Sequence, residues 1–564
     1  MRWFVVVIAV LLVALSLASS KLAADGTGSV SEKPLHEQVL DALRLQKSAV
    51  SRVLPQLHPT QPTFNHEAVI PPQCYTRTEG KFNPCYVCHQ DPIQGRENTM
   101  NDGELQLEYS FSDVGMTNHW ANLFEDRTER VAAISDAEID AWVAQDNYSA
   151  LPAQLRQGGF KGWIPDLENL QLGASAFDKH GMALDGSHWV AFNYKPLPST
   201  FWPTNGATDD VMLRLPKSFR TTPEGEYSLD VYRANLAILE AMIKGLTEVS
   251  TLPVDEQVVG VDLDLDGQLG IARMVKRLDT YVGAAKNAFI DDYVYPKGTE
   301  FLHTVRYLAV GPQGEISVST RMKEVRYMKK WQDRRKMAYR QGYEEEAFAK
   351  EEGRLPFYPL VGDWGLDNEF AWSVSGFIEG VDGQLRTATY EENLFCMGCH
   401  ASIGSTIDKT FSFARKVDGA AGWQYINLKG MPDAPNMGET DGEILTYLQR
   451  VGGGGEFRSN EEMQKRWFKA DGSVDVAAVR QAEDVYELIA PSPERARALN
   501  KAYRTIVADQ DYIYGRDAAV TAPLNVYEYI ENESAPTLDD DKFVNWDIRL
   551  KWGSLNAPEV AAGQ

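Results

Sequence analysis

Two short stretches of the chain combine residue types and spacing that suit a cofactor site. The first reads CYVCH at residues 85–89, and the second reads CMGCH at residues 396–400. In each stretch two cysteines lie three positions apart and a histidine follows the second cysteine directly. Together the stretches use four of the five cysteines of the chain. The chemistry they serve must therefore need the same triplet twice.

Three kinds of chemistry use paired cysteines at this spacing. The four thiols together offer the ligands of a zinc or iron–sulfur site, and either pair alone offers a thioredoxin-like dithiol. Neither requires a histidine at the next position. Covalent haem does, because both thiols bond to the porphyrin and the following imidazole ligates the iron from below. We therefore expect two haem c groups, attached at Cys85, Cys88, Cys396 and Cys399, with His89 and His400 as proximal ligands of the haem iron.

On these two motifs the chain resembles the diheme c-type cytochromes. The resemblance implies haem attachment after export and electron transfer through two covalent haems, with a redox partner protein or a small electron donor or acceptor. The long stretches of chain without a haem motif keep two alternatives open. One is a diheme oxidoreductase, peroxidase-like or oxygenase-like, with one open coordination site. The other is a haem-containing binding or sensory protein.

The second motif is followed by a pattern typical of small cytochromes c. Met431 lies in a Gly-Met-Pro turn, Met437 follows it, and a helix with apolar residues on one face is predicted after them. By the same resemblance either methionine is a candidate distal ligand, and residues 390–452 are expected to form a cytochrome c-like module. Ordinary loop or core methionines are the alternative.

The first motif has no such turn, and the candidates for its distal ligand include two histidines. His66 lies upstream and His119 lies downstream. His303, surrounded by apolar residues, is a candidate from a distant part of the chain. The remaining cysteine, Cys74, is expected to be a buried inert thiol, and a thiolate ligand of haem iron is the alternative.

A third motif lies between the two CxxCH stretches. VDLDLDGQLGIAR, residues 261–273, matches the first half of an EF-hand-type calcium loop, with Gly267 at the sharp turn. Its twelfth position is Arg273 instead of glutamate, so a closing carboxylate must come from elsewhere, or the site is weak. An acidic turn without metal is the alternative. The predicted calcium ligands are Asp262, Asp264, Asp266 and the carbonyl of Gln268.

The N-terminus predicts export. An apolar run from Trp3 to Ala18 follows Arg2, and small residues come after it. This is the pattern of a signal peptide cleaved between about residues 18 and 24, and an uncleaved anchor is the alternative. No cysteine lies near the cleavage region, so the pattern does not predict a lipid anchor. We expect a periplasmic or otherwise exported protein without a transmembrane segment in the mature chain.

Charge argues against one class of partner. The formal net charge is −24 and the isoelectric point is about 4.9. Nucleic-acid phosphates require a basic surface, so a nucleic-acid partner is not expected.

The elements that must position these residues are predicted to be mostly helices. Apolar spacing and capping residues predict helices near 34–57, 134–145, 228–247, 459–468, 474–489 and 492–508, and a long helix carrying the basic run from Lys329 to Lys336. One hairpin is predicted over 299–328 around Gly311–Gly314. We therefore expect a mainly α protein with a smaller β component, of α+β class, with two haem c regions around a mixed middle region. The expected parts are a signal peptide at 1–24, an N-terminal haem region at 25–150, a middle region with the calcium loop at 151–345, a second, cytochrome c-like haem region at 346–455 and a C-terminal helical region at 456–564.

Overall fold

The computed structural model describes residues 70–108, 111–199, 203–354, 356–452, 460–517, 519–531 and 537–553. All of them belong to one compact unit, Leu57–Gln564, and a second unit comprises Met1–Gln56. The predicted signal peptide, the predicted helix at 34–57 and the candidate ligand His66 lie outside the described residues. The domain boundaries proposed above stay predictions.

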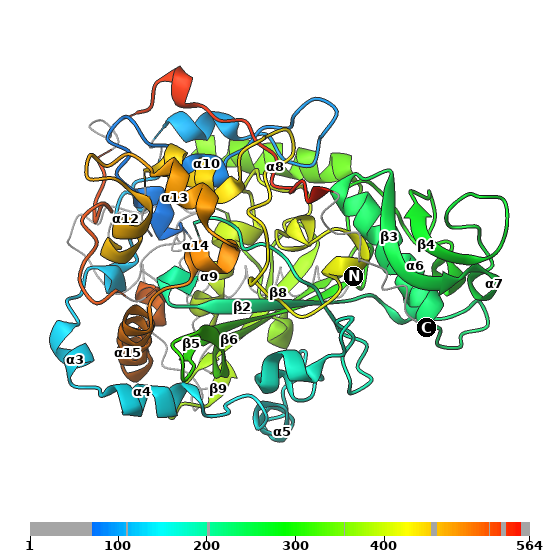
Figure 1. The fold of residues 1–564 in the computed structure, drawn as a ribbon, viewed down its shortest axis with the longest axis horizontal. Helices are drawn as coiled ribbons and strands as arrows, with labels where there is room; N and C mark the ends of the chain where they lie inside the picture. The colour runs from blue at the N-terminus through cyan, green and yellow to red at the C-terminus, as the bar shows by residue number, and fades with distance from the viewer. Residues whose placement is uncertain are drawn as a thin grey trace, which may run out of the picture. The chain divides into compact units, whose positions relative to one another are not determined.

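A seven-stranded antiparallel sheet forms the framework of the described unit (Figure 1). The strand order is β1-β2-β5-β6-β8-β7, and β9 pairs with β8. Strands β3 and β4 form a separate two-stranded ribbon. The strands are β1 Val190–Ala191, β2 Thr208–Arg214, β3 Glu248–Asp255, β4 Ile271–Lys276, β5 Glu300–Val310, β6 Ile316–Lys330, β7 Leu366–Asp367, β8 Trp372–Glu379 and β9 Leu385–Thr387.

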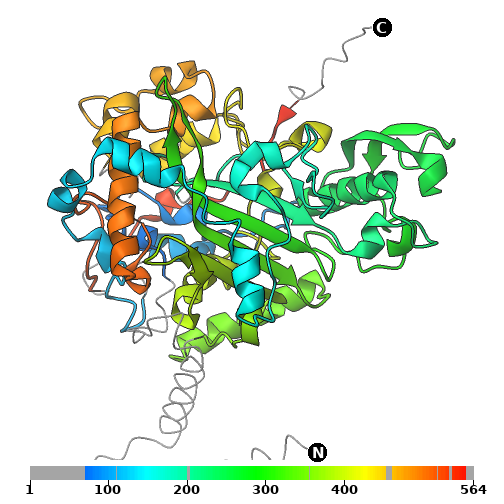
Figure 2. The same ribbon diagram turned by 90° about the horizontal axis from the view of Figure 1, so that it is seen from below.

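Helices pack around the sheet and beside the ribbon. Helices α4 and α15 contact β5, whereas α6 and α7 contact β3; Figure 1 and Figure 2 both show the α6–α7–β3–β4 group at one end of the unit. The helices are α3 Thr128–Ala132, α4 Asp136–Val143, α5 Leu151–Gln157, α6 Leu229–Lys244, α7 Glu256–Val259, α8 Lys336–Glu351, α9 Tyr390–His400, α10 Glu443–Val451, α12 Glu461–Trp467, α13 Val476–Gln481, α14 Val485–Ile489 and α15 Pro493–Asp509.

The expected mainly α fold was wrong, because a large antiparallel sheet organises the chain. Its longest strand, β6, has 15 residues and carries several charged side chains that are buried. Sequence analysis assigned Lys329 and Lys330 to a long helix, but both end β6, and α8 begins only at Lys336. Lys330 is buried and pairs with Asp408, a distant residue. Because a remote partner neutralises Lys330, the last residues of β6 carry no local signal of a buried strand.

Several local predictions were confirmed. The hairpin β5–β6 turns at Gly311–Gly314 as expected. Helix α6 begins after Ser228, whose Oγ accepts a hydrogen bond from Val231 N at 3.2 Å. Helix α4 begins after Ser135, whose Oγ accepts from Glu138 N at 3.2 Å. Such caps satisfy backbone N–H groups that lack a partner in the first helical turn.

Different hydrophobic clusters support the two CxxCH stretches. Tyr86 and Val87 of the first stretch are buried in a cluster with α10 and Trp546. Leu394 and Met397 of the second stretch belong to the cluster formed by α6 and the sheet. Helix α10, predicted to accompany the second motif, therefore packs beside the first.

Candidate functional site

Both CxxCH stretches form a helical turn. Cys85–Val87 is a 3-10 helix, η2, and His89 N donates to Cys85 O at 3.0 Å. In the second stretch both cysteines and His400 lie on the last turns of α9. Residues three and four positions apart share one side of a helix. Each motif thus presents two thiols and one imidazole together.

Helix α9 starts with a capping box that fixes where the second motif lies. Thr389 Oγ1 accepts from Glu392 N at 3.1 Å, and Thr389 N donates to Glu392 Oε2 at 2.8 Å. Glu392 also pairs with Arg386 at 2.8 Å. This reciprocal arrangement satisfies two backbone groups at the helix start. The capping box fixes the start of α9, and the position of the motif at the end of this helix follows from it.

The imidazole of His89 is held by a buried carboxylate. Its Nδ1 donates to Asp102 Oδ2 at 2.9 Å, and Asp102 is only 3% exposed. An ionised carboxylate only accepts hydrogen bonds, so Nδ1 carries the proton and Nε2 keeps its lone pair. A carboxylate behind an imidazole is the usual way in which proteins orient a metal-binding histidine.

The imidazole of His400 is held by a backbone carbonyl. Its Nδ1 donates to Lys409 O at 2.7 Å, and the ring meets Phe411 edge-on at a centroid distance of 5.5 Å. Burial, with the nearby charges of Arg326 and Lys409, lowers the pKa of His400 to about 4. The imidazole is therefore neutral at physiological pH, which is the form that binds metal.

The two histidines share a common arrangement. In the part of the chain that the structure describes, Nε2 of neither His89 nor His400 makes a hydrogen bond. Each ring is anchored through Nδ1, and the lone pair of Nε2 is available to a metal ion. Each imidazole is therefore arranged to bind a metal ion through its Nε2 atom.

The fold brings the cysteines of the two motifs into one region. Burial raises the pKa of the Cys88 thiol, and the nearby thiols of Cys399 and Cys74 raise it further. The pKa of Cys74 is raised by burial, then by Cys85 and Cys399. All five cysteines are unpaired thiols with part of their surface accessible.

The cysteines do not surround a single metal ion. Among the described residues, the one group of three or more candidate ligands whose donor atoms lie within 4.8 Å of one another contains no cysteine. The arrangement therefore gives no support to the four-cysteine zinc or iron–sulfur alternative. Cys74, the predicted inert thiol, lies close to both motifs.

The candidate distal ligands lie in different places. His303 on β5 acts electrostatically on His400, and its Nε2 lies 3.3 Å from Asp209 Oδ2. Met431 is buried in the hydrophobic cluster that holds Tyr86 of the first motif. Their roles as distal ligands stay predictions.

The other two described candidates lie at half-buried positions. His119 Nε2 lies 3.3 Å from Val114 O. Met437 N donates to Arg549 O at 3.0 Å, and Met437 O accepts from Arg96 at 2.5 Å. Met437 is thus fixed through its backbone.

Sequence analysis missed a cationic group beside the second motif. Arg326 of β6 and Arg516 both donate to Glu324, each at 2.8 Å. Both guanidinium groups lower the pKa of the Cys396 thiol, against the larger effect of burial, which raises it. No local pattern relates these residues to the motif, because β6 and residue 516 reach it only through the fold.

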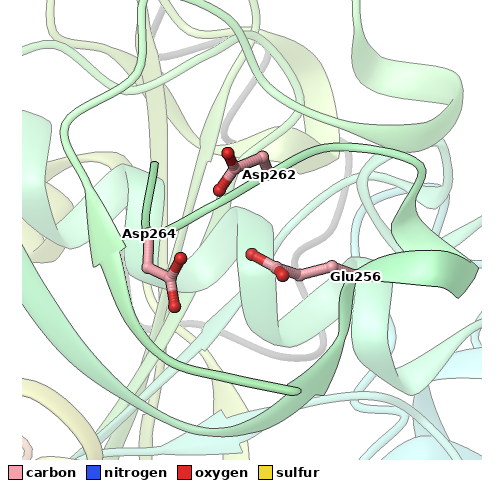
Figure 3. Close-up of side chains that lie close together, drawn as sticks. All are labelled: Glu256, Asp262 and Asp264. Atoms are coloured by element: carbon pink, nitrogen blue, oxygen red, sulfur yellow. The ribbon is translucent and has the colours of Figure 1, made fainter. Parts of the chain in front are cut away.

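The calcium motif forms a carboxylate cluster at the ribbon (Figure 3). Donor oxygens of Asp262, Asp264 and Glu256 lie within 4.8 Å of one another. Glu256, at the start of α7, is 1% exposed and was not predicted, although a carboxylate from outside the loop was. Asp266 is not part of the group, and its Oδ1 accepts from Gln268 N at 2.7 Å.

Comparisons with known proteins identify the family of this chain. A family model described as ":-like lipoprotein" matches residues 58–487. The chain belongs to this lipoprotein family. A protein of Aquifex aeolicus (strain VF5) named "Uncharacterized lipoprotein" is 34% identical to this lipoprotein over 514 residues, which cover 80% of this chain and 86% of that protein. No solved structure matches this chain.

These comparisons correct the predicted family and function. Assignment to the diheme c-type cytochromes was wrong, because the matched family is a lipoprotein family. Electron transfer and its alternatives, a diheme oxidoreductase and a haem-containing sensory protein, were inferred with that family. The two names refer to a lipoprotein and not to haem or redox chemistry, so the prediction of these functions was wrong. Both CxxCH stretches lie inside the matched region, and their chemistry needs an explanation of its own.

Family membership agrees with the predicted export of the protein. No helix of the described residues has the length and apolar character needed to cross a membrane. The expected redox partner and the expected absence of a nucleic-acid partner stay predictions.

Proposed function

We propose that this lipoprotein holds two covalently attached haem c groups, one at each CxxCH stretch. The observation that carries the proposal is the repeated geometry of thiols and imidazole. Each stretch presents two thiols and an imidazole from one helical turn, and each imidazole is anchored through Nδ1 with Nε2 free. Haem c uses this set of groups, two thiols for its vinyl carbons and one nitrogen for its iron. The proposal concerns the cofactor and assigns no reaction to it.

The surrounding charges support an anionic ligand. Arg326 and Arg516 both pair with the carboxylate of Glu324, and both guanidinium groups act on the Cys396 thiol of the second motif. Guanidinium groups bind carboxylates well because their planar donors match the two oxygens. The porphyrin of haem carries two propionates, so a cationic group beside the second motif favours such a ligand.

Pigment and mass of the secreted protein test this proposal. The full chain is expressed in a host that attaches haem c during export, and intact mass and the pyridine haemochrome spectrum are measured. We expect two haems per chain and a mature N-terminus between residues 18 and 24, which we propose as the cleavage region. A colourless wild-type chain would overturn the proposal.

Variants assign each haem to its motif. Replacing Cys85 and Cys88 by Ser should remove one haem, and replacing Cys396 and Cys399 by Ser should remove the other. Cys74→Ser is the matched control, because it removes a neighbouring thiol outside both motifs and should leave both haems. Loss of haem in the control alone would contradict the assignment.

A second proposal concerns the carboxylate cluster at the ribbon. We propose that Asp262, Asp264 and Glu256 bind one calcium ion with a structural role. Glu256 supports this, because it supplies a carboxylate from outside the loop where the twelfth loop position is Arg273. Oxygen donors from a flexible loop and one fixed acidic residue are the ligands that calcium prefers.

A further inference from the structure

One buried carboxylate contacts both CxxCH regions. Asp102 Oδ2 accepts from His89 Nδ1 at 2.9 Å and from Gly404 N at 3.0 Å. Its Oδ1 accepts from Gln90 N at 2.9 Å. His89 and Gln90 belong to the first motif region, whereas Gly404 follows the second motif. Residues 302 positions apart in the chain are therefore joined through one side chain.

The contact with Gly404 depends on a close backbone approach. A Cβ at this position would lie 1.8 Å from Asp102 Oδ1 and 2.9 Å from Gln90 O. Met100 N also donates to Gly404 O at 2.8 Å. Glycine therefore lets the segment after the second motif lie directly against the one after the first.

The segment that Asp102 contacts also orients the second imidazole. Residues 403–409 contain Gly404 and end at Lys409, whose carbonyl holds His400 Nδ1 at 2.7 Å. Lys409 Nζ donates to Ile403 O at 2.5 Å, which closes the segment on itself. Burial lowers the pKa of the Lys409 ammonium to about 7, and the negative charge of Asp102 is the largest effect that opposes this.

We propose that Asp102 is a positioning residue shared by both haem sites. It holds His89 directly, and it holds His400 through the segment 403–409. The inference rests on the proposed haem attachment and deepens it, because it makes the two iron–imidazole bonds depend on one carboxylate. A substitution of Asp102 therefore changes the position of the imidazole at both haem sites.

The variant Asp102→Asn tests the inference in the haem-loaded protein. The amide keeps the shape of the side chain but lacks the charge and one acceptor oxygen, so both imidazoles lose part of their anchor. The readouts are the iron–imidazole stretching frequency and the EPR g-values, measured in wild type and in backgrounds that retain only one haem. We expect shifts in both single-haem backgrounds with haem stoichiometry unchanged. A shift at the first haem alone would overturn the shared role, and no shift at either would overturn positioning altogether.

Asp91→Asn is the matched control. Asp91 lies in the segment between His89 and Asp102, and its Oδ1 accepts from Gly103 N at 2.9 Å. The imidazoles of His89 and His400 bond to Asp102 and to Lys409 O instead. The control should leave both spectra as in wild type. Shifts of equal size in the control would show that any loosening of this segment acts on the haems, and would overturn a specific role for Asp102.

Gly404→Ala tests the link from the opposite side and serves if Asp102→Asn does not fold. The substitution lies beside the second motif, but its Cβ displaces the Asp102 carboxylate. We expect the signal of the first haem to shift in the background that lacks the second haem. An unchanged first haem would overturn the link. Failure of the haem proposal is seen separately, as a wild-type chain without haem.

Discussion

At the scale of single residues, the chain buries charges and neutralises them with partners from distant segments. Glu324 is 3% exposed and pairs with Arg326 and Arg516. Burial raises the pKa of this carboxyl, but the two guanidinium groups outweigh burial and lower the pKa to about 2. The ionised form of Glu324 is therefore more stable in the folded protein than in the unfolded chain.

Glu324→Gln should lose this stabilisation at neutral pH. The pKa falls from 4.5 to about 2 on folding, which corresponds to about 3 kcal/mol in the free energy of unfolding. The contribution is complete above the unfolded pKa and is lost as the pH falls through the folded pKa. We expect a lower urea midpoint for the variant at pH 7, and a smaller difference from wild type at pH 3, both followed by tryptophan fluorescence.

The control for this prediction is Glu226→Gln, which changes an exposed carboxylate. It should leave the urea midpoint unchanged at both pH values. A loss in Glu324→Gln that is equally large at pH 7 and pH 3 would show that packing, and not charge, accounts for the effect.

At the scale of elements, the ribbon β3–β4 depends on the loop that joins α7 to β4. Its carboxylates already accept hydrogen bonds from the loop backbone, as when Asp262 Oδ2 accepts from Gly267 N at 2.8 Å. Glu256 ties the loop to the start of α7 by accepting from Leu263 N at 2.6 Å. Three carboxylates this close repel one another, and a bound cation would relieve the repulsion.

Calcium should therefore raise the thermal unfolding midpoint of the protein. Binding at a hundred times the dissociation constant stabilises a fold by about 2.7 kcal/mol. The double variant Asp262→Asn, Asp264→Asn should abolish the shift between EGTA and calcium chloride, measured by calorimetry. Asp266→Asn, outside the cluster, should retain most of the shift. Equal shifts in wild type and the double variant would contradict the calcium site.

At the scale of the whole molecule, a segment near the C-terminus packs against the first motif. Trp546 Nε1 donates to Tyr86 O at 2.6 Å, although the two residues lie 460 positions apart. Its ring is 2% exposed and meets Tyr86 at a centroid distance of 5.5 Å. Asn98 Nδ2 donates to Asp547 Oδ1 at 3.1 Å nearby. This segment lies beyond residue 487, where the family match ends.

Trp546→Ala should destabilise the protein by about 3–5 kcal/mol, the usual cost of removing a buried tryptophan. Trp546→Phe keeps most of the ring and loses the hydrogen bond, so it should cost about 1–2 kcal/mol. Urea midpoints measure both. Trp331→Ala, at a position 42% exposed, is the control and should have a small effect. An equally small effect of Trp546→Ala would contradict a closing role for this segment.

Features with a short range in the chain were predicted well. The helix predicted at 228–247 and the hairpin predicted at 299–328 both formed where apolar spacing and turn residues indicated them. The sheet was underestimated, because strands that complete it, such as β2, were not predicted. Strand β2 buries Asp209 and Asp210, and Asp210 is neutralised by Arg306, a distant residue on β5. A strand whose buried face is charged lacks the alternating apolar pattern.

The sequence by itself determined which atoms each motif offers, because spacing along a helix or a loop sets which side chains share a face. The tertiary structure alone decided that both motifs meet in one region, that Asp102 serves both, and that Glu256 completes the acidic cluster. These contacts join residues whose separation in the chain carries no periodic signal. They form only when the sheet and its helices pack, and packing depends on the whole chain.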